Sequence, residues 1–272
     1  MKNLITGVFT LMAMSFTFAQ ANLDMSTQNG NLNTATVDQT GMMNSNELLQ
    51  DGNRNTADID QVGIMNSNTA ESVGNRNSVD VDQNGWLNSN EVTQTGNRNA
   101  ASTWQVGISN STVQTQTGNR NEVSSIQWGA GNIAVQSQEG NRNSADSFQW
   151  GSGNIAGQVQ DGRRNEASGA QVGNGNILVQ YQLGDDNMAS HYQQGDGNIA
   201  GAVQIGDDNV AMGAQVGDGN LLGQLQVGNG NTALNTQAGD GNIALVSQSG
   251  DAHTHIGVQT GNNNSLMVNQ SN

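Results

Sequence analysis

Carboxamide side chains recur every eleven residues, and they are the most regular chemical groups in this sequence. Starting at Gln28 and stepping by 11, 22 of 23 positions are glutamine, with Ser72 the exception. A carboxamide both donates and accepts hydrogen bonds, so identical amides stacked one above another satisfy each other in a continuous ladder. The spacing predicts such ladders along the chain. Near the two ends of the repeat region, the predicted ladder residues are Gln28, Gln39, Gln50, Gln61, Gln83, Gln94, Gln105, Gln248 and Gln259.

Glycine and asparagine accompany the glutamines at fixed offsets. Glycine stands two residues after each of the first 22 steps, and asparagine stands five residues after each, with His253 the sole departure. Each Asn amide is also predicted to donate to the identical amide one turn away, as at Asn33, Asn44, Asn55, Asn242 and Asn264. Because Gly and Asn tolerate positive φ, tight arcs are predicted at Gly30, Gly41, Gly52, Gly63, Gly250 and Gly261.

The elements that position these amides are predicted to be β-strands. An eleven-residue period also suits a right-handed helical supercoil, but Gly and Asn in every unit are poor helix formers. Asn55, Ala57, Ile59 and Gln61 share one parity and predict an inner face, while the polar residues between them predict an outer face. Arginine recurs at steps of 22 from Arg54, so two eleven-residue units make one turn.

We therefore predict an all-β fold, a parallel in-register β-solenoid with two strands and two arcs per 22-residue turn. Each strand is expected to have about six or seven residues, with turns about 4.8 Å apart. Gln28 and Gln270 are 242 positions apart, which gives about 11 turns. The predicted solenoid domain spans residues 28–272, after a short segment at residues 20–27. Proline would remove a ladder donor, and the chain contains none.

The N-terminus has the parts of a secretory signal. Residues 1–19 consist of a short segment with Lys2, an apolar stretch and small residues at the end. This pattern predicts cleavage after Ala19 or Ala21. The chain contains no cysteine, which excludes disulfides. The net charge of −15 is unfavourable for binding the phosphates of nucleic acid, so no nucleic-acid partner is expected.

No arrangement of residues points to catalysis, a cofactor or a small-molecule substrate. His191, His253 and His255 are too few and too scattered for a zinc site. Aspartates in the later arcs, at Asp185, Asp186, Asp207, Asp208, Asp218 and Asp240, lack the spacing of a calcium-binding nonapeptide. We expect that the protein is not an enzyme and has no catalytic, cofactor or metal site; weak calcium binding by the Asp arcs stays open.

Two further columns recur at steps of 22. The apolar residues Ile133, Ile155, Ile177, Ile199, Leu221 and Ile243 have outward parity, with Val135, Val179 and Leu245 beside them. They form either a lateral contact or, if the strand is rotated, part of the core.

Trp104, Trp128, Phe148 and Trp150 predict a short packed ladder. The arginines from Arg54 to Arg164 repel one another unless acids such as Asp51, Glu139 and Asp161 lie close by.

The repeat unit resembles the curlin repeat of bacterial curli fibres. The pattern Gln-x-Gly-x-Gly-Asn-x-Ala-x-x-x-Gln stands at residues 127–138 and begins again at Gln149, Gln193 and Gln237, and the resemblance covers residues 28–270. It implies a secreted subunit, exported through an outer-membrane pore, started by a nucleator subunit, and built into an extracellular fibre at the bacterial cell surface for biofilm and adhesion. The acidic balance resembles a major subunit.

Both ends of the predicted rod lack a capping helix, proline or lysine cluster, which predicts head-to-tail addition of further copies. The expected function is therefore that of a self-polymerising structural subunit of a functional amyloid. Two alternatives stay open. One is a minor nucleator of the same fibre, favoured by the irregular unit at residues 249–258, and the other is a monomeric solenoid that binds calcium, ice or glycan.

Overall fold

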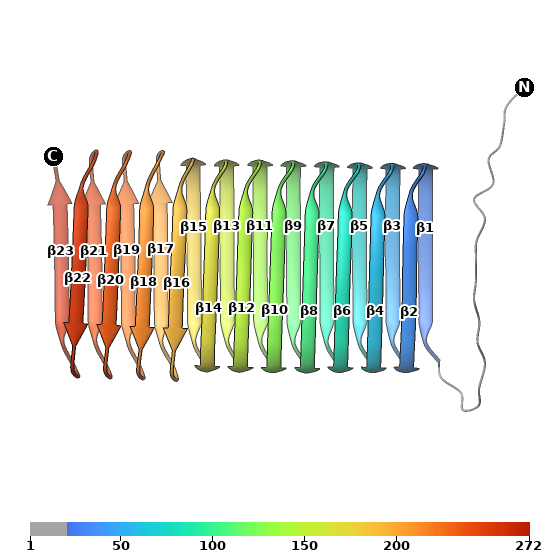
Figure 1. Cartoon of the computed structure of the whole chain (residues 1–272), viewed down its shortest axis with the longest axis horizontal. Helices are drawn as coiled ribbons and strands as arrows, with labels where there is room; N and C mark the ends of the chain where they lie inside the picture. Colours follow the sequence, from blue (N-terminus) through green and yellow to red (C-terminus); the bar gives the residue numbers. More distant parts are fainter. Residues whose placement is uncertain (1–20) are drawn as a thin grey trace, which may run out of the picture.

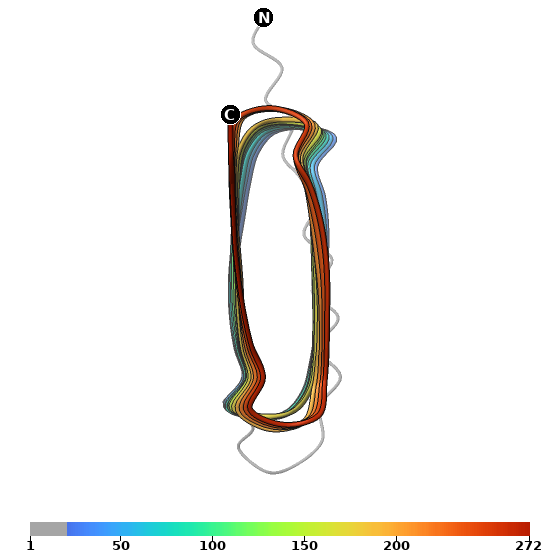
Figure 2. The same cartoon turned by 90° about the vertical axis from the view of Figure 1, so that its left-hand side faces the viewer.

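The computed structural model describes residues 21–272, which form one continuous solenoid of parallel strands. Successive strands alternate between two sheets, and each strand pairs with the strand two places along the chain, as Gln28 does with Gln50. Figure 1 shows the strands stacked along the long axis, and Figure 2 shows the flattened loop that each turn follows. The predicted leader, residues 1–19, lies outside the described residues.

The odd-numbered strands make a 12-stranded sheet. Its strands are β1 (Leu23–Asn31), β3 (Ser45–Asn53), β5 (Ser67–Asn75), β7 (Ser89–Asn97), β9 (Ser111–Asn119), β11 (Ile133–Asn141), β13 (Ile155–Arg163), β15 (Ile177–Asp185), β17 (Ile199–Ile205), β19 (Leu221–Val227), β21 (Ile243–Ser249) and β23 (Ser265–Ser271).

The even-numbered strands make an 11-stranded sheet. Its strands are β2 (Thr34–Met42), β4 (Thr56–Ile64), β6 (Ser78–Trp86), β8 (Ala100–Ile108), β10 (Glu122–Ala130), β12 (Ser144–Ser152), β14 (Glu166–Asn174), β16 (Met188–Gln194), β18 (Val210–Val216), β20 (Thr232–Ala238) and β22 (Thr254–Thr260).

The fold class predicted from the repeat is confirmed: the solenoid is all-β, parallel and in register, with two strands per 22 residues. Strand length differs from the expectation in the first part of the chain, where β1 to β15 have nine residues each, while β16 to β23 have seven. Strand β1 also begins at Leu23, five residues before the repeat count starts at Gln28, so most of segment 20–27 belongs to the first strand.

The change in strand length has a side-chain cause. From Asn174 onward, the residue after every arc glycine is Asp or Asn, whereas in the earlier odd-numbered strands the Asn at this position donates its amide to the next Asn amide, as Asn53 does to Asn75. In the later arcs, the backbone N–H of the Asp or Asn donates to the side-chain oxygen at the same position one turn later, as from Asp196 to Asp218 at 2.8 Å and from Asp207 to Asn229 at 2.9 Å. A side chain thus takes the place of the backbone carbonyl in the ladder, and the regular strand ends sooner.

The core is a thin layer of amide and small apolar side chains between the two sheets. Asn55, Ala57, Ile59 and Gln61 are all buried, while the outer positions beside them, such as Asp58, are exposed. This is the alternation expected for strands with one buried face. The packed interior therefore depends on amides as much as on hydrocarbon.

The apolar column that begins at Ile133 lies on the outside of the solenoid. Ile133, Ile155, Ile199 and Ile243 are 37% to 44% exposed, so the alternative of a rotated strand with these residues in the core is wrong. The aromatic residues also pack on the outer surface. Trp128 makes edge contacts with Trp104 at a centroid distance of 5.3 Å and with Trp150 at 5.8 Å.

Each arc contains two residues with positive φ. The first is the invariant glycine, for example Gly52 at φ 122°, and the second stands two residues later, as Arg54 does at φ 60°. Gly and Asn are the residues that we expected in this conformation, and the structure extends the set, since fourteen residues other than Gly and Asn adopt it in the described chain. The stacking compensates for the strain, because the Arg54 N–H donates to the Asn31 carbonyl oxygen at 2.9 Å.

The two positions of one arc should differ sharply in their tolerance of alanine. A Cβ added to Gly129 collides with the backbone carbonyl of Gly151 in the next turn, whereas one added to Gly131 meets nothing within 4 Å. Gly129→Ala is expected to lower the free energy of unfolding by more than about 3 kcal/mol.

The matched control, Gly131→Ala, should cost about 1 to 2 kcal/mol, because Ala252 already adopts φ 58° at the equivalent position. Denaturant unfolding followed by circular dichroism measures both. Equal losses for the two variants would contradict this account of the arcs.

Candidate functional site

The glutamine ladder of the even-numbered strands is continuous over the described chain. Each Nε2 group donates to the Oε1 atom of the glutamine one turn later, over 2.7 to 2.9 Å from Gln39 to Gln259. Gln61, Gln83 and Gln105 have no exposed surface. The ladder therefore satisfies buried amides that would otherwise destabilise the core.

The same amides also join the two sheets. The second N–H of Gln61 donates to the backbone carbonyl of Ser45 at 3.0 Å, and that of Gln83 donates to Ser67 at 3.0 Å. These carbonyls belong to the first residues of the facing strands. The sequence pattern gave no signal for these bonds, because they depend on the distance between the sheets.

The ladder of the odd-numbered strands has one gap, at Ser72. Gln28 donates to Gln50 at 2.8 Å and Gln94 donates to Gln116 at 2.9 Å. Ser72 Oγ donates to Gln94 Oε1 at 3.0 Å but takes no bond from Gln50, whose Nε2 donates only to the Thr34 carbonyl at 3.2 Å. The shorter side chain thus preserves one of the two ladder contacts.

The asparagines do not all make the same side-chain bonds: donation to the identical amide one turn earlier is absent at the first rungs of the described chain and is present from Asn88 and Asn110 onward after the even-numbered strands. Asn242 and Asn264 donate to the identical amide one turn earlier, at 3.1 and 2.9 Å, as predicted. For Asn33, Asn44 and Asn55 the prediction is wrong.

In these three residues the Nδ2 group donates to backbone carbonyls of the arcs instead. Asn33 contacts Gly52 and Asn55 contacts Gly74, both at 3.0 Å. The side-chain oxygen of Asn33 accepts the backbone N–H of Asn55 at 2.9 Å. The arc brings glycine carbonyls close to each Asn amide, so the asparagines bind the arcs of successive turns together.

Two further amide ladders on the inner face, and a third in the arcs from Asn31 to Asn141, were missed by the sequence interpretation. Gln114, Gln136, Gln158 and Gln180 stack at 2.8 to 2.9 Å on the inner face of the odd-numbered strands. A visible signal existed, since each stands two residues before a ladder glutamine. Nearer the N-terminus, Asn90, Asn68 and Asn46 stack at 2.7 Å in the same sheet, and Asn46 donates to Asp24.

His191 lies inside the solenoid and is 3% exposed. Its Nδ1 atom is 3.1 Å from Gln180 Nε2, and its Nε2 atom is 2.8 Å from Gln224 Oε1. The flanking rungs carry Gly169 and Gly213, which leave room for the ring. Burial disfavours the imidazolium and lowers the pKa of His191 to about 4.

The acidic arcs act on the backbone. Asp185, Asp196 and Asp218 belong to the chain of side-chain oxygens and backbone N–H groups that shortens the later strands. Within residues 21–272, no group of three or more His, Cys, Asp or Glu side chains gathers closely enough to hold a metal ion. The aspartates thus have a structural partner that does not depend on calcium.

Stacked carboxylates on the outer face of the even-numbered strands perturb one another. Partial burial and the neighbouring Asp38 and Asp58 raise the pKa of Asp60, and burial with Asp60 and Asp80 raises the pKa of Asp82. Protonation is thus easier in the solenoid than in the unfolded chain, and it relieves repulsion between rungs.

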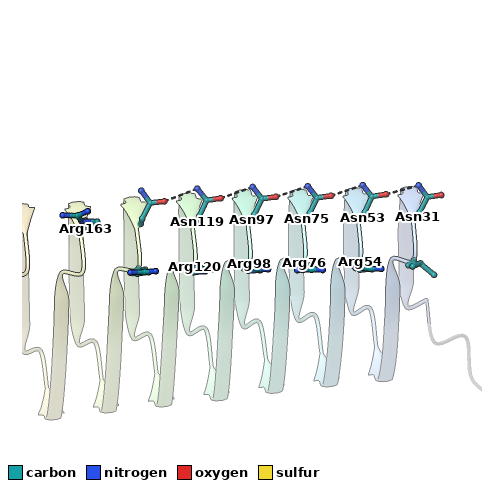
Figure 3. Close-up of a pocket in the computed structure, with 13 residues that line it drawn as sticks. Asn31, Asn53, Arg54, Asn75, Arg76, Asn97, Arg98, Asn119, Arg120 and Arg163 are labelled. Carbon is teal, nitrogen blue, oxygen red and sulfur yellow. Dashed lines mark hydrogen bonds between the residues drawn. The ribbon is translucent and has the colours of Figure 1, made fainter.

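The arginine arc lines a groove of about 920 Å³ along one edge of the rod. Figure 3 shows the Asn31–Asn119 amides in a column joined by hydrogen bonds, with the Arg54–Arg120 side chains stacked beside them. Among the described residues only Arg163 and Arg164 form ion pairs, with Asp185 and Asp186. Asp51, Glu139 and Asp161, the acids that could have balanced the column, make no such pair within residues 21–272.

The two ends of the described solenoid present edges with one paired side. Strands β1 and β2 pair only with β3 and β4, and β22 and β23 pair only with β20 and β21. The amides are also oriented: the Oε1 atoms of Gln28 and Gln39 accept no bond within residues 21–272, while Gln259 and Gln270 have no later glutamine to donate to. One end offers acceptors and the other donors.

Neither a comparison with models of known protein families nor a comparison with curated proteins finds a match for this chain. Residues 21–272 contain no helix long and apolar enough to cross a membrane.

Filling the gap at position 72 should stabilise the solenoid. Ser72→Gln restores an acceptor for Gln50 and keeps the donor to Gln94, so the free energy of unfolding is expected to rise by about 1 kcal/mol. Ser72→Ala removes the only donor to Gln94 Oε1 and should lower stability. Denaturant midpoints of the two variants test this, and a destabilised Ser72→Gln variant would count against the stacking of these amides.

Acidification should destabilise the fold through His191. The native imidazole stays neutral down to a pKa of about 4, whereas the unfolded side chain protonates below its ordinary value of 6.5. The contribution of His191 to the free energy of unfolding is therefore intact above pH 6.5. It falls by about 3 kcal/mol as the pH falls toward 4. Unfolding measured from pH 7 to 4 tests this.

His191→Gln, which keeps the volume without the titration, is the control for this effect. The raised pKa values of Asp60 and Asp82 act in the opposite direction in both proteins, so the difference between them isolates the histidine. Parallel pH profiles for the two chains would show that His191 does not contribute.

Proposed function

We propose that this chain is a structural subunit of an extracellular, curli-like fibre that grows by end-to-end stacking of solenoids. One observation carries the proposal: both ends of the described solenoid expose one-sided strand edges whose backbone and glutamine amides match each other. Ordering a chain costs about 1 to 2 kcal/mol per residue, and each turn is stabilised by its neighbours. A further copy supplies the missing neighbour at either end.

The resemblance to curlin repeats leads us to propose the biological setting as well. The chain would be a major subunit, secreted through an outer-membrane pore, nucleated at the bacterial surface by another subunit, and assembled into a matrix that supports adhesion. It would act without chemistry on a substrate. In such a role the ladder residues, from Gln28 and Gln39 to Gln248 and Gln259, serve self-assembly.

The register of the junction follows from the winding. The odd-numbered sheet ends at β23 and the even-numbered sheet ends at β22, so the next place in the spiral lies over β22. An incoming copy that continues the spiral lays β1 over β22 and β2 over β23. Gln259 then donates to the incoming Gln28, and the new copy is turned by about half a revolution about the rod axis.

Fibre growth and its register are testable together. A chain without the predicted leader, residues 20–272, is incubated without metal and followed by thioflavin fluorescence and electron microscopy. Unbranched fibres are expected. The native chain has no cysteine, so an introduced pair reports on the junction alone.

Val258→Cys with Thr27→Cys places the two thiols on paired positions in the half-turn register, where Cα atoms about 5 Å apart allow a disulfide. Oxidation should give a ladder of covalent oligomers. The matched control, Asn269→Cys with Thr27→Cys, fits a register without the half turn and should not cross-link. Cross-linking of the control in intact fibres would reject the register alone, whereas a chain that stays monomeric with a folded solenoid would reject the fibre.

A further inference from the structure

We propose that the groove along the arginine arcs binds a linear acidic polysaccharide laid parallel to the rod axis. This site does not depend on fibre formation. Six of the eight basic residues of a chain with net charge −15 line the groove, which concentrates positive charge on one edge of an otherwise acidic molecule. A single-sign stripe of this kind attracts a partner of opposite charge.

The backbone fixes the spacing of the arginines. Arg54, Arg76, Arg98, Arg120 and Arg142 occupy the same arc position in successive turns, each with φ near 60°. Parallel strands stack about 4.8 Å apart, so one guanidinium group follows another at that interval in a straight line. The neighbouring Asn amides, joined at 2.9 to 3.0 Å from Asn31 to Asn141, form a regular wall of the groove.

The charges in the middle of the groove have no partner within the described chain. Asp185 and Asp186 pair with Arg163 and Arg164 at the C-terminal end, and the hydrogen bond from Arg164 holds the pKa of Asp186 below its ordinary value. The five arginines from Arg54 to Arg142 make no ion pair in residues 21–272. Like charges on adjacent rungs repel, and an anion that spans the rungs removes that repulsion.

The straight course of the arginine column and the interval between its guanidinium groups determine which kind of polyanion fits the groove. A linear polyuronate carries one carboxylate per sugar along an extended chain, and guanidinium groups bind carboxylates through two parallel hydrogen bonds. Its hydroxyl groups also suit the Asn amides. Duplex DNA carries a phosphate every 3.4 Å per strand and winds away from a straight column. The stacked aspartates on the even-numbered sheet, such as Asp58 and Asp80, would repel its second strand.

The test measures binding of a polyuronate of about ten sugars to residues 20–272 by isothermal titration calorimetry. The five-residue variant changes Arg54, Arg76, Arg98, Arg120 and Arg142 to Asn, which already adopts φ 57° at Asn263, the corresponding position of an opposite arc. We expect at least about tenfold weaker binding by this variant, and weakening of wild-type binding by salt.

The matched control places Asn at the same backbone position in the opposite arcs, as Met43→Asn, Met65→Asn, Leu87→Asn and Ser109→Asn. It removes no charge and should bind as the wild type does. All proteins are compared in the same assembly state, with circular dichroism to confirm the fold. Unchanged binding by the arginine variant, salt-independent binding by the wild type, equal binding of neutral dextran, or tighter binding of duplex DNA would each overturn the proposal.

Discussion

The solenoid depends on the stacking of identical residues exactly one turn, or 22 residues, apart. Because each rung repeats the last, a buried amide finds its partner in its own copy, and the interior is built from Gln and Asn with little hydrocarbon. The same constraint fixes the arcs, where glycine carbonyls of the next turn leave no space for a side chain. Stability is therefore shared between neighbours, and no turn is independent of the rest.

Much of the fold followed from the sequence because the spacing is strict. The parity of Asn55, Ala57, Ile59 and Gln61 predicted the buried face, and the glutamine period predicted the ladder that the structure contains. Features that depend on the separation of the two sheets or on the shape of the arcs could not be predicted from the sequence. The Gln61 bond to the Ser45 carbonyl needs the separation of the two sheets, and the amides of Asn33 and Asn55 turn to arc carbonyls that no periodicity reveals.

Local preference was also a poor guide wherever stacking overrode it. Arginine has no tendency toward positive φ, yet Arg54 adopts it because the backbone hydrogen bond to Asn31 in the preceding turn compensates for the strain. The aspartates of the later arcs gave no sign of their bonds to the backbone, yet Asp218 accepts the backbone N–H of Asp196 where the strands become shorter. The deciding interactions join residues 23 apart in the first case and 22 apart in the second, and a scan of neighbouring residues does not detect them.

The common orientation of the glutamine amides gives each glutamine ladder a direction along the rod. Every glutamine-ladder carbonyl points toward the N-terminal end and every glutamine-ladder N–H points the other way, whereas the stacked amides of Asn242 and Asn264 have the opposite sense. The two tips of a filament built from such rods are chemically different. Only copies added in the same sense continue each glutamine ladder, so a filament assembled in the proposed way would be polar, with ends that present different side-chain groups.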